Sequence, residues 1–272
     1  MPDQPLAPVA MFWTNAPLSF VERLCIQSFL DVGHPLTMYS YEPVDGLPDG
    51  VEARDAREIM ACPDEIPTHE RTDSPALFSD VFRYRLLRRR PGVIWSDTDA
   101  YCLRPFRPVD GYLFSWDDAE RKTVASGVLA MPADSPALRE LNAWAADPEA
   151  VLPWLPPRIL AQALRRKRDG DPMTASEMPW GALGPQALTW ELRQSKEIRY
   201  ALPSEVLYPV HYSERGRYFR RARLTWQACT PATQSIHFYG RRVRDRLATY
   251  HDGVPPKGTI LDRLASRHGI AA

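Results

Sequence analysis

Two aspartates, Asp97 and Asp99, follow directly on the short apolar run VIWS at residues 93–96. Carboxylates this close repel each other unless a cation lies between them or water screens both. Residues two apart on a strand point to the same face, so the pair could share a hard divalent cation such as Mg²⁺ or Mn²⁺. Such a cation could hold a diphosphate and neutralise the charge on a departing phosphate oxygen. A solvated polar turn is the alternative interpretation, because acid-x-acid triplets are common.

The segment before this strand, residues 75–90, has the periodicity of an amphipathic helix whose broad apolar arc faces the core. Asp80 and Arg83 lie three residues apart on a different sector of that helix. The proline-glycine turn at 91–92 is too short to carry the chain far from it. Asp80 and Arg83 are therefore expected to converge with Asp97 and Asp99 on one pocket. The alternative is a surface ion pair, which would stabilise the fold by about 0.3 kcal/mol.

The elements around this region follow one another as in a parallel α/β sheet. Residues 8–13 predict a buried strand, and residues 18–34 predict a helix in which Ser19 and Glu22 form a capping box. Ser74 is expected to cap the helix whose first turn contains Pro75. Further strands are expected at 35–41, 93–96, 111–116, 123–132 and 234–240, and further helices at 55–60, 135–146, 156–168 and 186–194. The acid pair would then lie at the carboxyl end of a strand, the edge where open α/β sheets bind ligands.

Composition limits the class of protein. The 272 residues are enough for one large α/β domain with a sizeable core. Lys plus Arg and Asp plus Glu are both 34, so no net charge draws the protein to nucleic acid. The four cysteines include no CxxC pair and are expected to be reduced thiols. The first residues lack the pattern of a signal peptide and no run approaches ~18 apolar residues, so a cytoplasmic protein is expected. The basic run LRRKR at 164–168 allows weak peripheral membrane association, with a solvated helix face as the alternative.

Residues 79–106, SDVFRYRLLRRRPGVIWSDTDAYCLRPF, resemble the pattern of glycosyltransferases with a DXD sugar-binding region. In that pattern an SD..R helix leads through a Pro/Gly turn into a strand and D.D....L.P. The group is related to α-mannosyltransferases, α-1,4-galactosyltransferases and bacterial capsule or oligosaccharide enzymes. Three further segments also resemble this family and occur in the family's order. They are FWTNAPLSFVERLCIQSFLDVGHPLTMYSYEP at 12–43, GALGPQALTWEL at 181–192 and SIHFYG at 235–240. The resemblance covers most of residues 8–240, and the block 75–106 is its specific part.

The resemblance implies a GT-A fold, in which a mixed central sheet is flanked by helices. It implies a single domain over residues 1–272, with a nucleotide-sugar-binding half at 8–106, an acceptor half at 107–240 and a C-terminal tail at 241–272. The implied activity is metal-dependent transfer of a sugar, with retention of configuration, from a nucleotide sugar such as a UDP-sugar to a saccharide or other hydroxyl acceptor. Mn²⁺ or Mg²⁺ is the implied cofactor, and polysaccharide biosynthesis is the implied setting.

Carried over residue by residue, the resemblance makes Asp97 and Asp99 the catalytic pair. Asp99 would bind the metal, and Asp97 would contact the metal shell and the donor ribose or sugar. Asp80 and Arg83 would hold the donor sugar, so we expect Arg83→Ala to weaken donor binding with little loss of stability. His237 would reach the metal or the diphosphate from the far side of the cleft, with a purely structural histidine as the alternative.

Other donor and acceptor contacts are implied less directly. Trp13 would lie near the base of the donor, with a core aromatic as the alternative. The family often has asparagine in the strand after the DXD segment, and here Ser126 and Gly127 would take over its contacts with the donor. The loop at 170–185 is expected to supply acceptor or donor contacts. Its candidates are Glu177, Trp180 and Gly184. No acidic residue is identified as a nucleophile, and the leaving diphosphate could itself assist the attack.

Two other classes remain open. Phosphohydrolases of the haloacid-dehalogenase kind also place Asp-x-Asp after an apolar strand, with the first aspartate as nucleophile and the second as general acid. They carry Thr or Val two residues after the second aspartate, where this chain has Tyr101, and here a long segment with its own helices precedes the motif. A non-catalytic module that binds nucleotide sugars or carbohydrates is the second alternative. Donor hydrolysis with Mn²⁺ would separate the three classes.

Overall fold

The computed structural model describes residues 5–14 and 16–270. The strands in this part of the chain are β1 (Val9–Phe12), β2 (Leu36–Ser40), β3 (Val51–Asp55), β4 (Ile94–Ser96), β5 (Ala100–Cys102), β6 (Val128–Leu129) and β7 (Ser235–His237). The α-helices are α1 (Phe20–Val32), α2 (Ala76–Arg89), α3 (Pro136–Ala146), α4 (Pro157–Arg168), α5 (Pro185–Gln194), α6 (Ser204–Leu207), α7 (Arg223–Trp226), α8 (Gly240–Tyr250) and α9 (Ile260–His268). Three 3₁₀ helices are described, η1 (Ala56–Glu58), η2 (Glu197–Tyr200) and η3 (Tyr212–Phe219).

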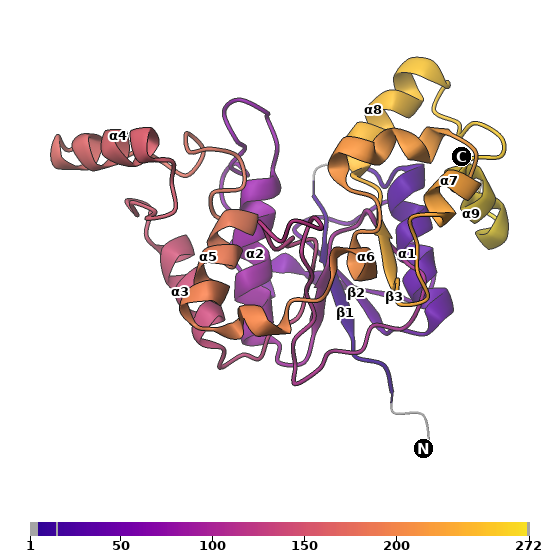
Figure 1. Cartoon of the computed structure of the whole chain (residues 1–272), viewed down its shortest axis with the longest axis horizontal. Coiled ribbons are helices and arrows are strands. Elements are labelled where there is room, and N and C mark those ends of the chain that lie inside the picture. The colour runs from indigo at the N-terminus through magenta and orange to yellow at the C-terminus, as the bar shows by residue number, and fades with distance from the viewer. Residues whose placement is uncertain (1–4, 15, 271–272) are drawn as a thin grey trace.

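The central sheet has five strands in the order β3-β2-β1-β4-β6 (Figure 1). β1 is parallel to β2 and β4, β2 is parallel to β3, and β6 joins β4 antiparallel. Helices flank this sheet on both sides, so the expected α/β class with a mixed central sheet is confirmed. The strand order reverses between β1 and β4, and ligands of open α/β sheets bind at the carboxyl edge beside such a point. Asp97 directly follows β4 and therefore lies there.

Local sequence accounts for the first strand-helix-strand unit. β1 is buried along its whole length. The Ser19 hydroxyl accepts from the N–H of Val21 while the Glu22 carboxylate accepts from the N–H of Ser19, so the expected capping box begins α1. Gly33 ends the helix in the left-handed region, with φ 97°, which only glycine adopts readily. The chain then enters β2, which pairs with β1 in parallel register.

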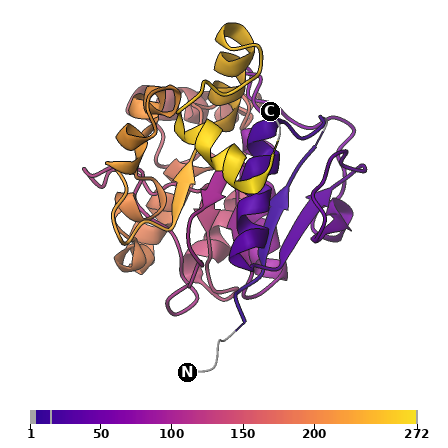
Figure 2. The same ribbon diagram turned by 90° about the vertical axis from the view of Figure 1, so that its right-hand side faces the viewer.

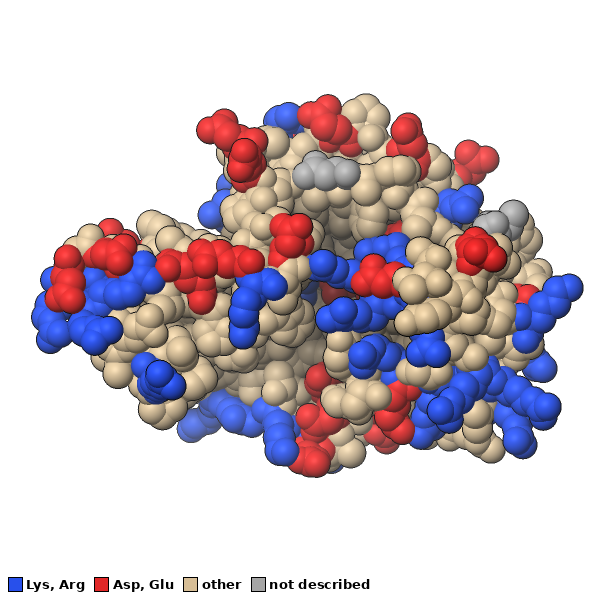
Figure 3. All heavy atoms as spheres, turned by 90° about the horizontal axis from the view of Figure 1, so that it is seen from above, with Lys and Arg blue, Asp and Glu red and all other residues tan. Residues whose placement is uncertain are grey.

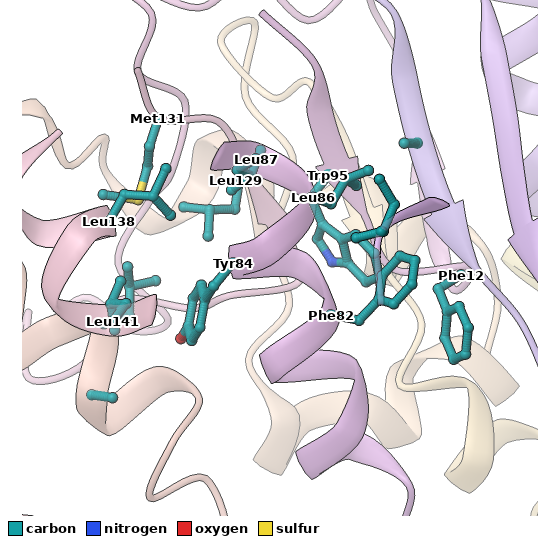
Figure 4. Packing of buried hydrophobic residues seen from close by; sticks show 14 of the residues in the cluster. Phe12, Phe82, Tyr84, Leu86, Leu87, Trp95, Leu129, Met131, Leu138 and Leu141 are labelled. Carbon is teal, nitrogen blue, oxygen red and sulfur yellow. The ribbon is translucent and has the colours of Figure 1, made fainter. Parts of the chain in front are cut away.

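α2 is apolar on two sides because it lies between the sheet and a second layer of helices (Figure 4). Toward the sheet, Phe82 packs on Phe12 of β1, with ring centroids 4.5 Å apart, and on Trp95 of β4. Toward α3, Tyr84 lies near Leu141 (Figure 4). Both contacts are buried, so they fix the rotation of α2 about its own axis and the direction of its remaining polar sector.

The C-terminal third adds a two-stranded sheet and further helices. β5, which follows the Asp97–Asp99 turn, pairs antiparallel with β7 so that Ala100 lies opposite His237. α8 and α9 both contact α1, and Figure 2 shows α9 crossing in front of it. Val243 of α8 and Leu261 of α9 are buried. The residues beyond 240 thus include two packed helices that share a core with α1 and β5.

Two expectations around α2 and β3 are wrong in detail. Residues 51–55 form an edge strand, and the helix expected at 55–60 is only the 3₁₀ turn η1, which the Asp55 side chain caps by accepting from the N–H of Arg57. α2 begins at Ala76 with Pro75 at the cap position, so Ser74 is not its N-cap, although its hydroxyl accepts from the N–H of Ala76 at 3.3 Å. Proline fixes the start because its φ is already close to that of a helix.

The strands expected at 111–116 and 123–132 are mostly absent. Within them the described backbone forms single bridges, and Val128–Leu129 alone is a strand. Each segment pairs with its neighbours at single residues only. Its alternating apolar side chains are buried, but its backbone does not form the continuous hydrogen-bond ladder of a strand. Among the described residues no helix is both long and apolar enough to span a membrane.

Candidate active site

A turn between β4 and β5, rather than the alternation of one strand, orients Asp97 and Asp99. The N–H of Ala100 donates to the Asp97 carbonyl at 3.2 Å, which closes the turn. The N–H of Asp97 donates to the carbonyl of Gly127 at 2.6 Å, and its Oδ1 accepts from Trp95 Nε1 at 2.9 Å. Asp97 is therefore held by both its backbone and its side chain. The alternative of a freely solvated turn does not hold for this residue.

Arg83 links Asp80 to Asp97 inside the protein. Its Nη1 lies 3.2 Å from Asp80 Oδ1, and its Nη2 lies 3.1 Å from Asp97 Oδ1. Nη1 also donates to the carbonyl of Ser126 at 2.7 Å, and the guanidinium carbon lies 5.0 Å from the centre of the Trp95 ring. Asp80 and Arg83 are only 5% and 3% exposed, so they do not form the surface ion pair that spacing alone allowed.

Burial changes the protonation equilibria of these groups. It raises the pKa of Asp80 to about 6, although the charge of Arg83 opposes the shift. It also raises the pKa of Asp97, again against Arg83, and the charge of Asp99 adds to the rise. For Arg83, burial alone would lower the pKa, but Asp97 and Asp80 outweigh it and raise the pKa. One guanidinium thus serves two acids, and a further cation near Asp97 and Asp99 would relieve their repulsion.

Asp99 meets His237 on the other side of the turn. Its Oδ2 accepts from the N–H of Gly240, the first residue of α8, at 2.6 Å, and its Oδ1 lies 3.4 Å from His237 Nε2. Asp97, Asp99 and His237 each offer one ligand atom, and these three atoms lie within 4.8 Å of one another. The pairing of β5 with β7 explains this convergence of residues far apart in the sequence, because it sets His237 opposite Ala100.

This donor set fits a divalent cation. Two carboxylates and an imidazole suit Mn²⁺ better than Mg²⁺, which prefers oxygen ligands alone. The Nδ1 atom of His237 is buried and has no hydrogen-bond partner among the described residues. A buried polar atom without a partner is costly, and an ion or ligand bound at Nδ1 itself would remove that cost, whereas Nε2 is the ring nitrogen that lies near Asp99. We therefore regard Asp97, Asp99 and His237 as a candidate metal centre.

Because Gly127 has no side chain, the residues of this cluster can occupy the space beside its Cα. A Cβ at position 127 would lie 2.8 Å from His237 Cε1, 3.0 Å from Asp97 Oδ2 and 3.1 Å from Tyr208 Oη. Real Cβ atoms essentially never make contacts of 2.8 Å, so any larger residue would displace at least one of these groups. The backbone of Gly127 thereby shapes the candidate metal centre as well as accepting from Asp97.

We expect Gly127→Ala to move His237 away from Asp97, to weaken Mn²⁺ binding, and to lower the free energy of unfolding by about 1–3 kcal/mol. Calorimetric titration with MnCl₂ and urea unfolding measure the two effects. Gly216→Ala is the matched control, because a Cβ at Gly216 meets no atom within 4 Å. If both variants bind Mn²⁺ like the wild type, the space beside Gly127 does not matter for the site.

Trp13 lies just beyond β1, on the α8 side of the site. Its Nε1 donates to the carbonyl of Ala16 at 2.5 Å, and its ring packs partly on the core. The guanidinium carbon of Arg244, from α8, lies 5.9 Å from the ring centre. Arg244 in turn forms an ion pair with the fully buried carboxylate of Glu22. The partly exposed indole of Trp13, with Arg244 beside it, thus lies next to the end of β1.

The loop before α5 places its three candidate residues in different surroundings. Glu177 is tied to Arg166, which lowers the pKa of this carboxyl to about 2. Trp180 is 52% exposed. Gly184 lies against Asp80, and a Cβ there would overlap the Asp80 carboxylate. Glu177 therefore closes the loop, Trp180 offers a free aromatic face, and Gly184 shapes the Asp80 side of the site.

Three residues near the cluster were missed from the sequence: Tyr208, Asp117 and Arg244. Tyr208 Oη accepts from the N–H of Val128 at 2.8 Å, and burial raises the pKa of this phenol well above its usual range. Burial also raises the pKa of Asp117. Asp117 could have been found, because it follows the expected strand at 111–116 as Asp97 follows the one at 93–96. Tyr208 and Arg244 carry no local signal in the sequence.

Comparison with solved structures returns glycosyltransferases at low similarity. The structure titled "PaToxG Glycosyltransferase" has 13% sequence identity and a TM-score of 0.42, over 72% of this chain and 71% of that chain. The apo structure of the bifunctional glycosyltransferase WbbM has 13% identity and a TM-score of 0.34, over 88% of this chain and 46% of that chain, so this chain spans about half its length. No family model and no curated protein matches the sequence. Similarities this distant do not assign an activity to this chain. The activity therefore has to be inferred from the residues of the site.

Proposed function

We propose that this chain is a metal-dependent glycosyltransferase of GT-A type that uses a nucleotide-sugar donor. The observation that carries the proposal is the cluster of Asp97, Asp99 and His237 at the carboxyl edge of the sheet, with the buried Arg83 and Asp80 beside it. Transfer from a diphosphate requires positive charge where the negative charge of the leaving group develops. A divalent cation supplies that charge when it is bound.

The residues of the site divide into three roles in this proposal. Asp97, Asp99 and His237 hold the cation. Arg83 positions Asp97 by engaging its Oδ1, which leaves Oδ2 for the cation or the donor. Asp80, held by Arg83 and packed under Gly184, faces the hydroxyl groups of the donor sugar. These roles require the acids to be ionised, which a bound cation favours and which Arg83 already supports.

The nucleotide end of the donor is proposed to lie between α8 and Trp13. The N-terminus of a helix carries partial positive charge, and the first N–H of α8 already donates to Asp99. Arg244 lies one turn further along α8, beside Trp13. The residues just before β1 enter it from below in Figure 1, so Figure 3 looks onto the carboxyl edge, where the surface is hollowed and several basic side chains lie beside the hollow together with a few acidic ones. This charge favours a diphosphate, with the base on the Trp13 side.

Several finer features of the proposal come from the resemblance of residues 79–106 alone. These are a UDP-sugar donor, retention of configuration, and a role in polysaccharide biosynthesis. The division into a donor half at 8–106, an acceptor half at 107–240 and a C-terminal segment at 241–272 is part of the same proposal. A cytoplasmic location, weak peripheral membrane association through the basic run at 164–168 and the lack of a nucleic-acid partner are proposed from the composition and the sequence pattern instead.

A panel of UDP- and GDP-sugars, each with and without MnCl₂, tests the proposed function by thermal shift and by release of free nucleotide. We expect Tm to rise only when Mn²⁺ and a matching donor are both present. A ligand at 100 times its Kd stabilises by about 2.7 kcal/mol, which corresponds to roughly 5–10 °C for a chain of this size. No shift and no nucleotide release with any donor would refute the proposal.

The same panel separates the two alternative classes. Binding of a donor without turnover would favour a non-catalytic module. Release of phosphate from simple phosphate esters would favour a phosphohydrolase of the haloacid-dehalogenase kind. That class carries Thr or Val two residues after the second aspartate, where this chain has Tyr101. We therefore expect no phosphate release.

A further inference from the structure

Asp117 and His211 face each other beside the candidate metal centre. Asp117 follows a segment whose N–H groups are anchored: Trp116 donates to Leu202 at 3.1 Å and Asp117 donates to Thr123 at 2.8 Å. The Asp117 Oδ2 and His211 Nε2 atoms are 4.0 Å apart, which is too long for a hydrogen bond. The two side chains are 33% and 41% exposed, so a ligand can reach both. We call them the Asp117–His211 pair.

The tautomer of His211 is set by its own turn. The backbone N–H of Ser213 donates to Nδ1 at 3.3 Å, and the Ser213 hydroxyl lies 2.8 Å from the same nitrogen. Because Nδ1 accepts from a backbone donor, the proton of the neutral imidazole lies on Nε2, which faces Asp117. The pair therefore presents one donor and one charged acceptor. A single hydroxyl placed between them can accept from Nε2 and donate to the carboxylate.

A row of aromatic rings connects this pair to the candidate metal centre. Ring centroids lie 5.4 Å apart for Tyr208 and His237, 4.9 Å for His237 and Tyr239, and 5.2 Å for Tyr239 and Tyr212. Tyr239 has φ 55°, an uncommon backbone conformation for a bulky residue, and it places the ring against His237. The row ends at Tyr212, which is 37% exposed and directly follows His211 in the chain.

The electrostatics of Asp117 agree with this proximity. Burial raises the pKa of Asp117, and the charges of His211 and His237 oppose the rise. Asp117 is therefore close enough to His237 to sense it, although no contact between them is described. Asp80 and Arg83 contact the cluster from α2 through Asp97, whereas Tyr239 and Tyr212 contact it through His237.

We propose that Asp117, His211 and Tyr212 form the subsite that binds the acceptor, and that the acceptor group held there is a sugar ring. The proposal rests on the proposed function and specifies its acceptor. A carboxylate and an imidazole recognise a hydroxyl that donates and accepts. The guanidinium carbon of Arg215 lies 4.0 Å from the centre of the Tyr212 ring, so the opposite face of this ring is the one that would cover the apolar C–H face of a sugar. A simple alcohol could satisfy the pair through its hydroxyl but lacks the ring C–H face that would lie on Tyr212, and a protonated amine could donate to the carboxylate but could not accept from Nε2.

Saturation-transfer NMR with methyl α- and β-hexopyranosides as probes, in the presence of MgCl₂ and UDP, tests the subsite. The wild type is expected to transfer saturation to at least one glycoside. Asp117→Asn and His211→Ala should each weaken its binding by about tenfold or more, because the first removes the negative charge of the acceptor and the second removes the donor. Glu214→Gln is the matched control: it lies in the same 3₁₀ helix as Tyr212 and is paired with Arg217 instead.

Each outcome decides between the proposals. Loss of glycoside binding in both variants but not in Glu214→Gln supports the subsite; equal binding in all four proteins overturns it, as does a wild type that binds no glycoside. If Asp117→Asn fails to fold, His211→Ala carries the test, because it lies on a separate segment. Calorimetric binding of nucleotide sugars is measured in parallel. Nucleotide sugars bound without glycosides would leave the proposed function standing and reject the subsite. Glycosides bound without nucleotide sugars would reject the proposed function and leave a sugar-binding site without a role in transfer.

Discussion

Asp99→Asn is expected to weaken Mn²⁺-dependent donor binding by about 100-fold or more and to leave the fold intact. Asparagine retains an oxygen that can accept from the N–H of Gly240, where Asp99 Oδ2 accepts at 2.6 Å, so α8 keeps its anchor. What is lost is the negative charge that faces His237 and the proposed ion. Changes behind the metal ligands typically cost 10–100-fold in affinity, and removal of a direct ligand should cost at least as much.

Calorimetric titration of donor with and without MnCl₂ measures this loss, and thermal unfolding checks the fold. The matched control is Asp49→Asn, which removes the same charge from an exposed loop between β2 and β3. Donor affinity in Asp99→Asn equal to that of the control would remove Asp99 from the metal centre. A fall in Tm much larger than that of the control would show that Asp99 acts mainly as the anchor of α8.

Arg83→Met is expected to destabilise the protein by about 3–5 kcal/mol and to lower Tm by roughly 10 °C. The substitution leaves the carboxylate of Asp80, which is 5% exposed, without its cation, and frees Asp97 from its contact at 3.1 Å. This prediction differs from the expectation from sequence, which is that loss of Arg83 would cost little stability. Spacing on α2 could place Arg83 beside Asp80 but could not show that both are buried.

A double-mutant cycle measures the coupling directly. Adding Asp80→Asn to Arg83→Met should recover part of the lost stability in urea unfolding, because it removes one of the two uncompensated charges. Arg88→Met is the control, since Arg88 is exposed on the same helix. Strict additivity of the two substitutions, or an Arg83→Met variant as stable as Arg88→Met, would contradict a structural role for the buried pair.

The sequence predicts the part of the fold in which one hydrophobic signal dominates. β1, α1, β2, α2 and β4 all lie where the apolar periodicity places them, and Ser19 and Glu22 form the expected capping box. Those elements are buried on at least one side by close neighbours, so pattern and structure agree. The same reasoning placed Asp80 and Arg83 with Asp97, because a helix, a short turn and a strand leave little freedom between them.

The remaining features depend on contacts that the sequence does not encode locally. β3 is an exposed edge strand of alternating polar residues, so it has no apolar run to mark it. The N–H of Gly240 donates to Asp99 only because the packing of the chain places the start of α8 beside that carboxylate. Asp117 and His211 come from two segments that are far apart in the sequence and lie close together only in the folded chain. Long-range register of this kind is set by tertiary packing, and spacing along one segment cannot reveal it.

The strand pair β5–β7 joins Ala100 to His237 and thereby brings an early and a late part of the chain together. A polypeptide released by the ribosome before β7 is made would contain both aspartates yet lack the imidazole and the helix that follows it. Such a product would lack part of the candidate ion-binding set, and under the proposed function it could not consume a nucleotide sugar. Only a chain that has been synthesised beyond β7 would then be able to bind the ion through all three residues.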